Sequence, residues 1–124
     1  MRKIKPVDAS RFSFDVHRDL SVTPSERLPG PPKRIDGMTM GVVTMEHSAP
    51  HGGEAHPDGD EVIYVISGRL RVTGDSSPHT PWDPEPGQAC VIAAGEWHTV
   101  DVLEKTQFIH VTPGPNGDHR PPQS

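Results

Sequence analysis

Hydrophobic and polar residues alternate along several short stretches of the chain, which is the pattern of β-strands with one buried face. In residues 11–16 the alternation puts Phe12, Phe14 and Val16 on one side of a predicted strand. Residues 37–46 alternate in the same way, with apolar side chains on both faces. The N-terminal part of the chain therefore predicts two strands.

Two pairs of apolar segments in the second half of the chain flank short turn sequences. The dipeptide Ser67-Gly68 predicts a hairpin turn, and residues 103–106 predict a second one. The predicted strands beside these turns, with one more short strand between them, are residues 61–66, 69–73, 88–93, 97–102 and 107–112. Many short strands with Gly and Pro turns favour a sandwich or a barrel.

Proline and glycine gather in a few regions, among them residues 23–32 and 113–122. A strand needs backbone donors that proline lacks, so residues 23–32 predict an ordered loop or extended connector without a strand. The predicted division is an N-terminal strand or arm with a Pro-rich connector (1–36), a β-barrel (37–112) and a Pro-rich C-terminal tail (113–124).

Composition and charge narrow the class of protein. With 124 residues, of which 31% are hydrophobic, there is room for one core. Val and Ile outnumber Leu, which favours an all-β fold because β-branched side chains pack well on strands. A net charge of −5 argues against a nucleic-acid partner. Since no apolar run long enough for a membrane segment or secretory signal occurs, we expect a cytoplasmic protein without a membrane partner.

Histidine is the residue type most suggestive of chemistry, with eight in the chain. Glu54 and His56 are two residues apart, so their side chains point the same way in an extended segment. Glu61 begins the next predicted strand after a tight connection at residues 57–60, which returns its carboxylate toward His56. His98 begins another predicted strand after a glycine turn. Imidazoles and carboxylates that meet at strand ends suit a divalent first-row metal.

These spacings resemble the two motifs of the cupin superfamily, G-x5-H-x-H-x3,4-E-x6-G and G-x5-P-x-G-x2-H-x3-N. The residues that match are His56, Glu61, Gly68, Gly87, Gly95 and His98. The resemblance implies an all-β, single-domain cupin fold, a double-stranded β-helix or jelly-roll barrel. It also implies a metal held by His56, Glu61 and His98.

The chain departs from the two motifs at four positions. Ser48, Glu54, Ala93 and Val102 stand where the motifs have glycine, histidine, proline and asparagine. The usual three histidines and one glutamate would become two histidines and up to two glutamates. Glu54 is then a ligand, a general acid or base, or a solvated side chain. His51, beside Gly52-Gly53, is a further candidate for ligation or catalysis if its loop bends inward.

The resemblance further implies an enzyme that acts on a small organic molecule able to chelate the metal through two oxygens. Ligand type alone does not choose among Fe, Mn, Ni, Zn and Co. A dioxygenase would use the metal with O₂, whereas an isomerase or lyase would use it to stabilise an enolate while Glu54 or His51 moves the proton. The alternative is a non-catalytic cupin that binds or senses a small polar compound.

The register of the strands leaves the role of His110 open. A shift of one residue decides whether this side chain, in the last predicted strand, faces the interior. Small cupins are often dimers, and the apolar side of residues 11–16 needs a cover, so we expect a homodimer. His17, His79 and His119 lie in polar surroundings and are expected at the surface.

Overall fold

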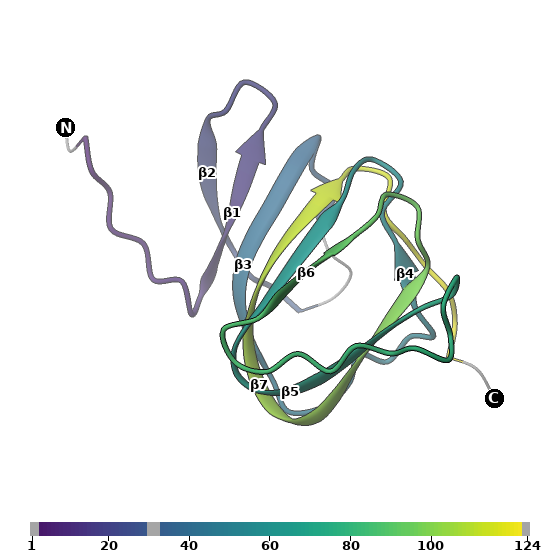
Figure 1. Ribbon diagram of the computed structural model, residues 1–124. Coiled ribbons are helices and arrows are strands. Elements are labelled where there is room, and N and C mark those ends of the chain that lie inside the picture. Colours follow the sequence, from purple (N-terminus) through teal and green to yellow (C-terminus); the bar gives the residue numbers. More distant parts are fainter. Residues whose placement is uncertain (1–2, 30–32, 123–124) are drawn as a thin grey trace.

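The computed structural model describes residues 3–29 and 33–122. These residues form strands joined by turns and loops (Figure 1), which are β1 (Phe12–His17), β2 (Val22–Glu26), β3 (Gly37–Met45), β4 (Glu54–Ala55), β5 (Glu61–Gly74), β6 (Ala89–Ile92), β7 (His98–Gly114) and β8 (Asp118–His119). The first two residues of the chain, and residues 30–32 of the predicted Pro-rich connector, lie outside the described part. Within the described part, no helix is long and apolar enough to cross a membrane.

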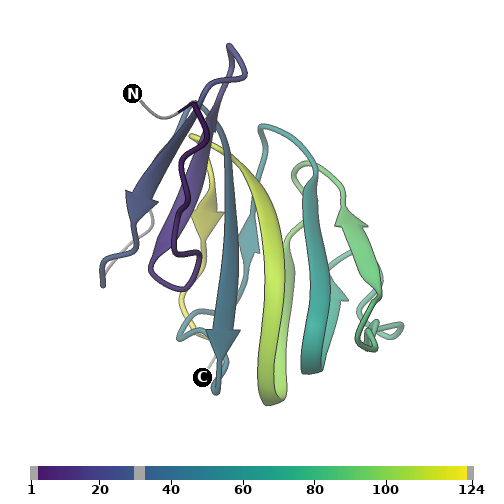
Figure 2. The same ribbon diagram turned by 90° about the vertical axis from the view of Figure 1, so that its left-hand side faces the viewer.

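The strands form one antiparallel sheet that curls round an interior. Its strands follow the order β2-β1-β3-β7-β4-β8, and β5 pairs with both β7 and β6. The two longest strands, β5 and β7, pair with each other along most of their length. Figures 1 and 2 show these strands bending, with β2 and β1 at one edge of the curled sheet. The expected all-β jelly-roll architecture is confirmed.

The two predicted hairpin turns are wrong. Ser67-Gly68 lies inside β5, and residues 103–106 lie inside β7, so each expected pair of strands is one long strand. In a jelly roll, a strand can pass from one side of the barrel to the other through a bend. The polar and glycine residues that resemble a hairpin turn instead mark this corner.

The corner between β5 and β7 depends on bulges and on one glycine. Their pairing changes register repeatedly between Val65 and Leu70. Gly68 has a φ of +92°, and a Cβ atom there would lie 2.2 Å from the carbonyl oxygen of Lys105. Only glycine combines this backbone conformation with so close an approach of the two strands.

Two proline-containing segments are more regular than the sequence predicts. Residues 23–26, expected to lack a strand, belong to β2, which pairs with β1 at the edge of the sheet. Pro24 is tolerated there because an edge strand leaves one side of its backbone unpaired. The segment expected as a tail also joins the sheet, since β7 runs through Gly114 and β8 pairs with β4. The three-part division of the chain stays a prediction.

The hydrophobic core lies on the inward face of β5 and its neighbours. Its buried members are Ile63, Val65, Leu70, Val72, Ile92 and Phe108. Buried residues alternate at the start of β5, so Glu61 points to the same side as Ile63 and Val65. The strand therefore carries a carboxylate into the interior, where Glu61 is only 4% exposed.

In β1 the polar side faces the interior of the barrel and the apolar side faces outward. Ser13 and Asp15 are buried, whereas Phe12, Phe14 and Val16 are only half-buried. The predicted strand and its apolar side are therefore present, but that side faces away from the barrel interior.

Replacing Gly68 by alanine tests the corner, and Gly87 offers a matched control. Gly87 has almost the same φ, +91°, but a Cβ atom there would meet nothing within 4 Å. We expect Gly87→Ala to lower the free energy of unfolding by about 1–2 kcal/mol through its backbone conformation alone. Gly68→Ala should lower it clearly more, because the added Cβ also meets the Lys105 carbonyl. Denaturant-induced unfolding measures both losses, and equal losses would contradict this account of the corner.

Candidate metal centre

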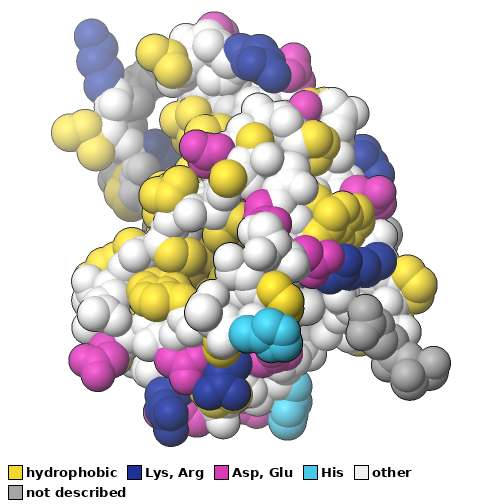
Figure 3. All heavy atoms as spheres, turned by 45° about the vertical axis from the view of Figure 1, so that its right-hand side comes forward, with side chains coloured by type: hydrophobic (Ala, Val, Ile, Leu, Met, Phe, Trp, Pro, Cys, Tyr) yellow, Lys and Arg dark blue, Asp and Glu magenta, His cyan; other side chains and the backbone are white. Residues whose placement is uncertain are grey.

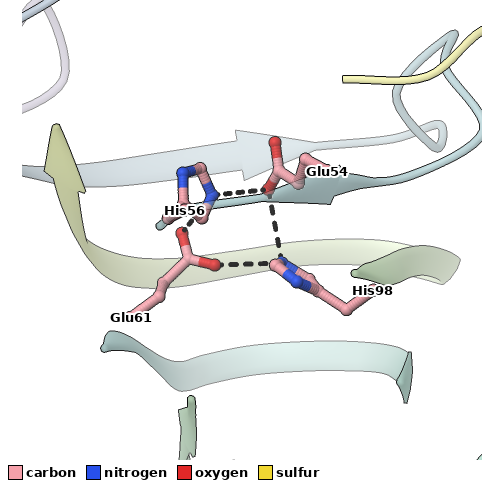
Figure 4. Close-up of side chains that lie close together, drawn as sticks. All are labelled: Glu54, His56, Glu61 and His98. Atoms are coloured by element: carbon pink, nitrogen blue, oxygen red, sulfur yellow. Dashed lines mark ion pairs between the residues drawn. The ribbon is translucent and has the colours of Figure 1, made fainter. Parts of the chain in front are cut away.

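Four of the residues singled out in the sequence converge in the interior of the sheet. Glu54 lies in β4, His56 follows it, Glu61 begins β5 and His98 begins β7. One nitrogen or oxygen atom from each lies within 4.8 Å of those of the other three. Figure 4 shows the four side chains pointing toward one another. The short β4 reaches this place because Glu54 pairs with His98 across the sheet.

The distances within this group define a compact cluster of two carboxylates and two imidazoles. His98 Nε2 is 3.1 Å from Glu61 Oε1, and His56 Nε2 is 3.6 Å from Glu61 Oε2. Glu54 Oε1 lies 3.6 Å from the Nε2 atoms of both histidines. His98 is 1% and Glu61 4% exposed, whereas the side chain of Glu54 is 26% exposed, so water reaches the cluster on the side of Glu54.

Several buried atoms of the cluster have no hydrogen-bond partner among the described residues. They are His56 Nδ1 and Nε2, Glu61 Oε1 and His98 Nε2. The 3.1 Å contact between His98 and Glu61 is thus an ion pair without hydrogen-bond geometry. Buried polar atoms without partners are rare because they are costly. A cation would satisfy those that face the centre, and nitrogen and oxygen ligands suit a divalent transition metal.

Hydrogen bonds from behind hold two of these side chains in place. His98 Nδ1 donates to the carbonyl oxygen of Glu96 at 2.9 Å, which leaves Nε2 free to face the centre. The Thr112 hydroxyl donates to Glu61 Oε2 at 2.6 Å and accepts a hydrogen bond from His110 Nδ1 at 2.8 Å. The register of β7 therefore turns His110 inward, as one support of Glu61.

A glycine makes room for His110. Gly41 lies opposite His110 in the β3–β7 pair. A Cβ atom on Gly41 would lie 2.7 Å from His110 Nε2. A larger residue at this position would push the imidazole away from Thr112.

The charges of the cluster favour positive charge at its centre. Burial alone would raise the pKa of Glu54, but His56 and His98 hold it well below its usual range. Burial also opposes a charge on His98, yet Glu54 and Glu61 raise the pKa of His98 to about 10. The pKa of His56 is raised against burial by the same two carboxylates. The carboxylates thus stabilise cationic groups between them.

His51 lies at the rim of the cluster and outside the group of four. Its Nε2 is 3.8 Å from Glu54 Oε2, and its Nδ1 accepts a hydrogen bond from the Gly53 amide at 3.2 Å. The ring also lies against His119, with 5.3 Å between ring centroids. The loop therefore bends toward Glu54 but brings His51 only to the outer oxygen of that carboxylate.

The other histidines are not members of the cluster. His79 and His119 are exposed, as expected, while His17 is half-buried with Nε2 2.8 Å from Thr23 Oγ1. Sequence reasoning missed Thr112. Thr112 lies on β7 and its partner Glu61 on β5, 51 residues away in the sequence. No short-range spacing in the sequence could therefore have identified this hydrogen bond.

A family model described as "Cupin domain" matches residues 41–112, more than half of the chain. The chain belongs to the cupin family. This confirms the resemblance drawn from the two motifs. In a search of the curated proteins, no protein matches this cupin.

Solved structures share the fold of this cupin. A conserved protein of unknown function from Streptococcus pyogenes is 24% identical with a TM-score of 0.54, over 64% of this chain and 67% of that one. Oxalate decarboxylase from Bacillus subtilis is 22% identical with a TM-score of 0.55, over 68% of this chain and 24% of that one. DMSP lyase DddQ from Ruegeria pomeroyi is 18% identical with a TM-score of 0.52, over 65% of this chain and 40% of that one. The present chain thus spans less than half the length of either enzyme.

The inward position of His110 predicts how stability depends on pH. Burial lowers the pKa of His110 from its usual 6.5, although Glu61 and Glu54 oppose the shift. Below about pH 6.5 the unfolded chain therefore binds a proton that the folded protein resists, so the contribution of His110 to the free energy of unfolding falls in acid and returns as the pH rises. We expect His110→Gln to remove this contribution, so that the variant gains less stability than the wild type between about pH 5 and pH 7, as measured by denaturant unfolding.

The control for this change is His79→Gln, because His79 is exposed. It should leave the slope of stability against pH as in the wild type. An unchanged slope in His110→Gln would show that this imidazole is not held neutral by the fold.

Proposed function

We propose that this cupin is a metal-dependent enzyme in which His56, Glu61, His98 and Glu54 hold a divalent transition metal, one of Fe, Mn, Ni, Zn or Co. The observation that carries the proposal is the convergence of buried nitrogen and oxygen atoms that lack hydrogen-bond partners among the described residues. Oxalate decarboxylase, which has Mn(II) centres, and DMSP lyase are enzymes with a similar fold, which supports the proposal.

The charge of the ligand set affects how strongly a substrate binds, whereas the substrate class comes from the resemblance to cupins. Two glutamates balance a divalent cation, so the loaded centre attracts an anion less than one with three histidines and one glutamate would. We assign it a small organic substrate with two oxygens in chelating positions, such as a keto-enol, a hydroxy acid or a phenol. When bound, the metal supplies either Lewis acidity for isomerase or lyase chemistry or redox reactivity for a dioxygenase.

The protein's own contribution to proton movement lies at the rim. Glu54 presents Oε1 to the two ligand histidines and Oε2 to His51. His51 accepts the Gly53 amide at Nδ1, so a neutral ring carries its hydrogen on Nε2, which faces Glu54. Glu54 Oε2, with the Nε2–H of His51 beside it, is thus proposed as the group that accepts and returns a substrate proton at the side of the centre.

Small molecules fit the surface better than nucleic acid or a membrane does. On the face shown in Figure 3, Lys and Arg side chains lie beside Asp and Glu rather than gathering into one basic patch. The net charge of −5 also gives little attraction to phosphate groups. We therefore propose a small-molecule partner for this cupin, and the proposed place in the cytoplasm rests on the sequence alone.

The outward face of the sheet supports a homodimer. One row of directly paired residues crosses five neighbouring strands and is apolar throughout. It consists of Phe14, Met40, Val111, Val62 and Val91. Met40 is 37% and Val91 68% exposed. A row of this kind on the outside of a sheet is typical of an interaction surface, and a second copy presents an identical apolar face to cover it.

Metal content tests the proposed centre. We expect protein purified without added metal, or loaded with a transition metal and desalted, to hold about one ion per chain. His56→Ala and His98→Ala should each abolish this, because each removes a ligand from a set of four. Elemental analysis gives the stoichiometry, and His79→Ala, an exposed histidine, is the control.

Wild-type protein that retains no metal under any loading condition would reject the enzyme proposal and favour a non-catalytic cupin that binds a small polar compound. With an active preparation, oxygen consumption during turnover separates the two chemistries. A dioxygenase consumes O₂, and an isomerase or lyase does not.

Light scattering tests the dimer. We expect a dimer mass at micromolar concentration and a monomer mass for Met40→Lys, because the charge would be buried without a partner in the middle of the apolar row. Leu20→Lys, at an 82% exposed residue between β1 and β2, should remain dimeric. A wild-type monomer, or a Met40→Lys dimer, would reject this interface.

A further inference from the structure

The C-terminal segment lies across the two chain segments that carry Glu54 and His98. β8 pairs with β4 through Glu54 and His119, so the segment begins beside one proposed ligand. The next residue, Arg120, continues this contact through its backbone. Its amide donates to the carbonyl oxygen of Gly53 at 3.0 Å, and its carbonyl accepts from the Gly52 amide at 2.8 Å.

The side chain of Arg120 joins this segment to the start of β7. Its two terminal nitrogens bind both carboxylate oxygens of Asp75 at 2.6 and 2.7 Å. Its Nε donates to the carbonyl oxygen of Gly52 at 2.9 Å. The guanidinium group also lies over the ring of Trp97, 5.1 Å from its centroid. Arg120 thus contacts the residues just before Glu54 and the residue just before His98.

The partners of Arg120 are themselves tied to the start of β7. The Asp75 amide donates to the carbonyl oxygen of Trp97 at 2.8 Å. Gly53 has a φ of +136°, and a Cβ atom there would lie 2.9 Å from Arg120 Nε and 3.0 Å from the carbonyl oxygen of His98. The arginine, the glycine and β7 are therefore packed with no space for a side chain between them.

The segment that carries Glu54 is short, and it is paired with β8 on one side and with β7 on the other. β4 has only two residues, and it meets β7 at a single pair, Glu54 with His98. A site that must hold its ligands within a fraction of an ångström needs support from surrounding residues. The contacts of Arg120 supply that support from outside.

We propose that Arg120, through Asp75, Trp97 and the Gly52-Gly53 backbone, is a positioning residue that fixes Glu54 against His98 and so sets the metal affinity of the centre. This rests on the proposed metal site. The arginine lies outside the group of proposed ligands, and it acts by joining the two segments that present them.

The chain contains a matched control for this clamp. Arg71 binds both carboxylate oxygens of Asp83 at 2.9 and 2.8 Å, and its side chain is partly exposed, at 44% against 30% for Arg120. Exposed ion pairs contribute little to stability by themselves. Arg71→Ala therefore removes the same kind of ion pair without touching the segments that hold Glu54 and His98.

Co²⁺ titration of the full chain tests the proposal. We expect Arg120→Ala to weaken Co²⁺ binding about 10- to 100-fold and to change the visible absorption spectrum of the saturated protein. Arg71→Ala should bind with wild-type affinity and spectrum. Wild-type affinity and spectrum in Arg120→Ala would overturn the proposal, and so would an equal loss of affinity in both variants.

Hydrogen exchange in the metal-free protein separates a failure of the clamp from a failure of the metal site. We expect Arg120→Ala to increase amide exchange both in residues 51–55 and in residues 97–99, and Arg71→Ala to leave both segments unchanged. Increased exchange confined to the C-terminal segment would overturn the clamp. A wild-type protein that binds no Co²⁺ would instead reject the metal site, and with it the role in metal affinity.

Discussion

Two carboxylates held side by side in a barrel interior require positive charge between them. In this protein, two histidines or a bound cation can supply that charge. Glu61 is almost fully buried next to the core of β5, where an uncompensated charge would be very costly. His56 and His98 approach both Glu54 and Glu61. The same electrostatics that hold protons on the imidazoles in a metal-free chain favour a divalent cation when one is bound.

The sequence was a good guide to strands and a poor guide to turns. The apolar run of residues 61–66 identified the first part of β5, and the tight connection at residues 57–60 indicated that Glu61 returns toward His56. Ser67-Gly68 was misread, since a corner inside a long strand and a hairpin turn use the same residue types. Pro24 was misread for a similar reason: its effect depends on whether its strand lies at an edge, which is a property of the assembled sheet.

The sequence predicted the four residues of the cluster, but it did not predict the residues that hold them in place. Glu54, His56 and Glu61 are close in the chain, so extended geometry and a tight connection were enough to bring them together. His98 followed from the motif spacing. Thr112 and Arg120 act across strands that are distant in sequence, and their partners depend on register and on the path of the C-terminal segment. No pattern among neighbouring residues of the sequence indicates the role of Thr112 or that of Arg120.

The length of β7 has a consequence for how this protein can vary in evolution. Its first residue, His98, and a residue near its other end, Thr112, both approach Glu61, and the bent stretch at residues 103–106 lies between them. Inserting or deleting one residue in that stretch would turn every side chain of one arm to the opposite face. Surface loops accommodate such length changes easily. Homologues that keep this chemistry should therefore differ in loop length elsewhere while preserving the spacing along β7.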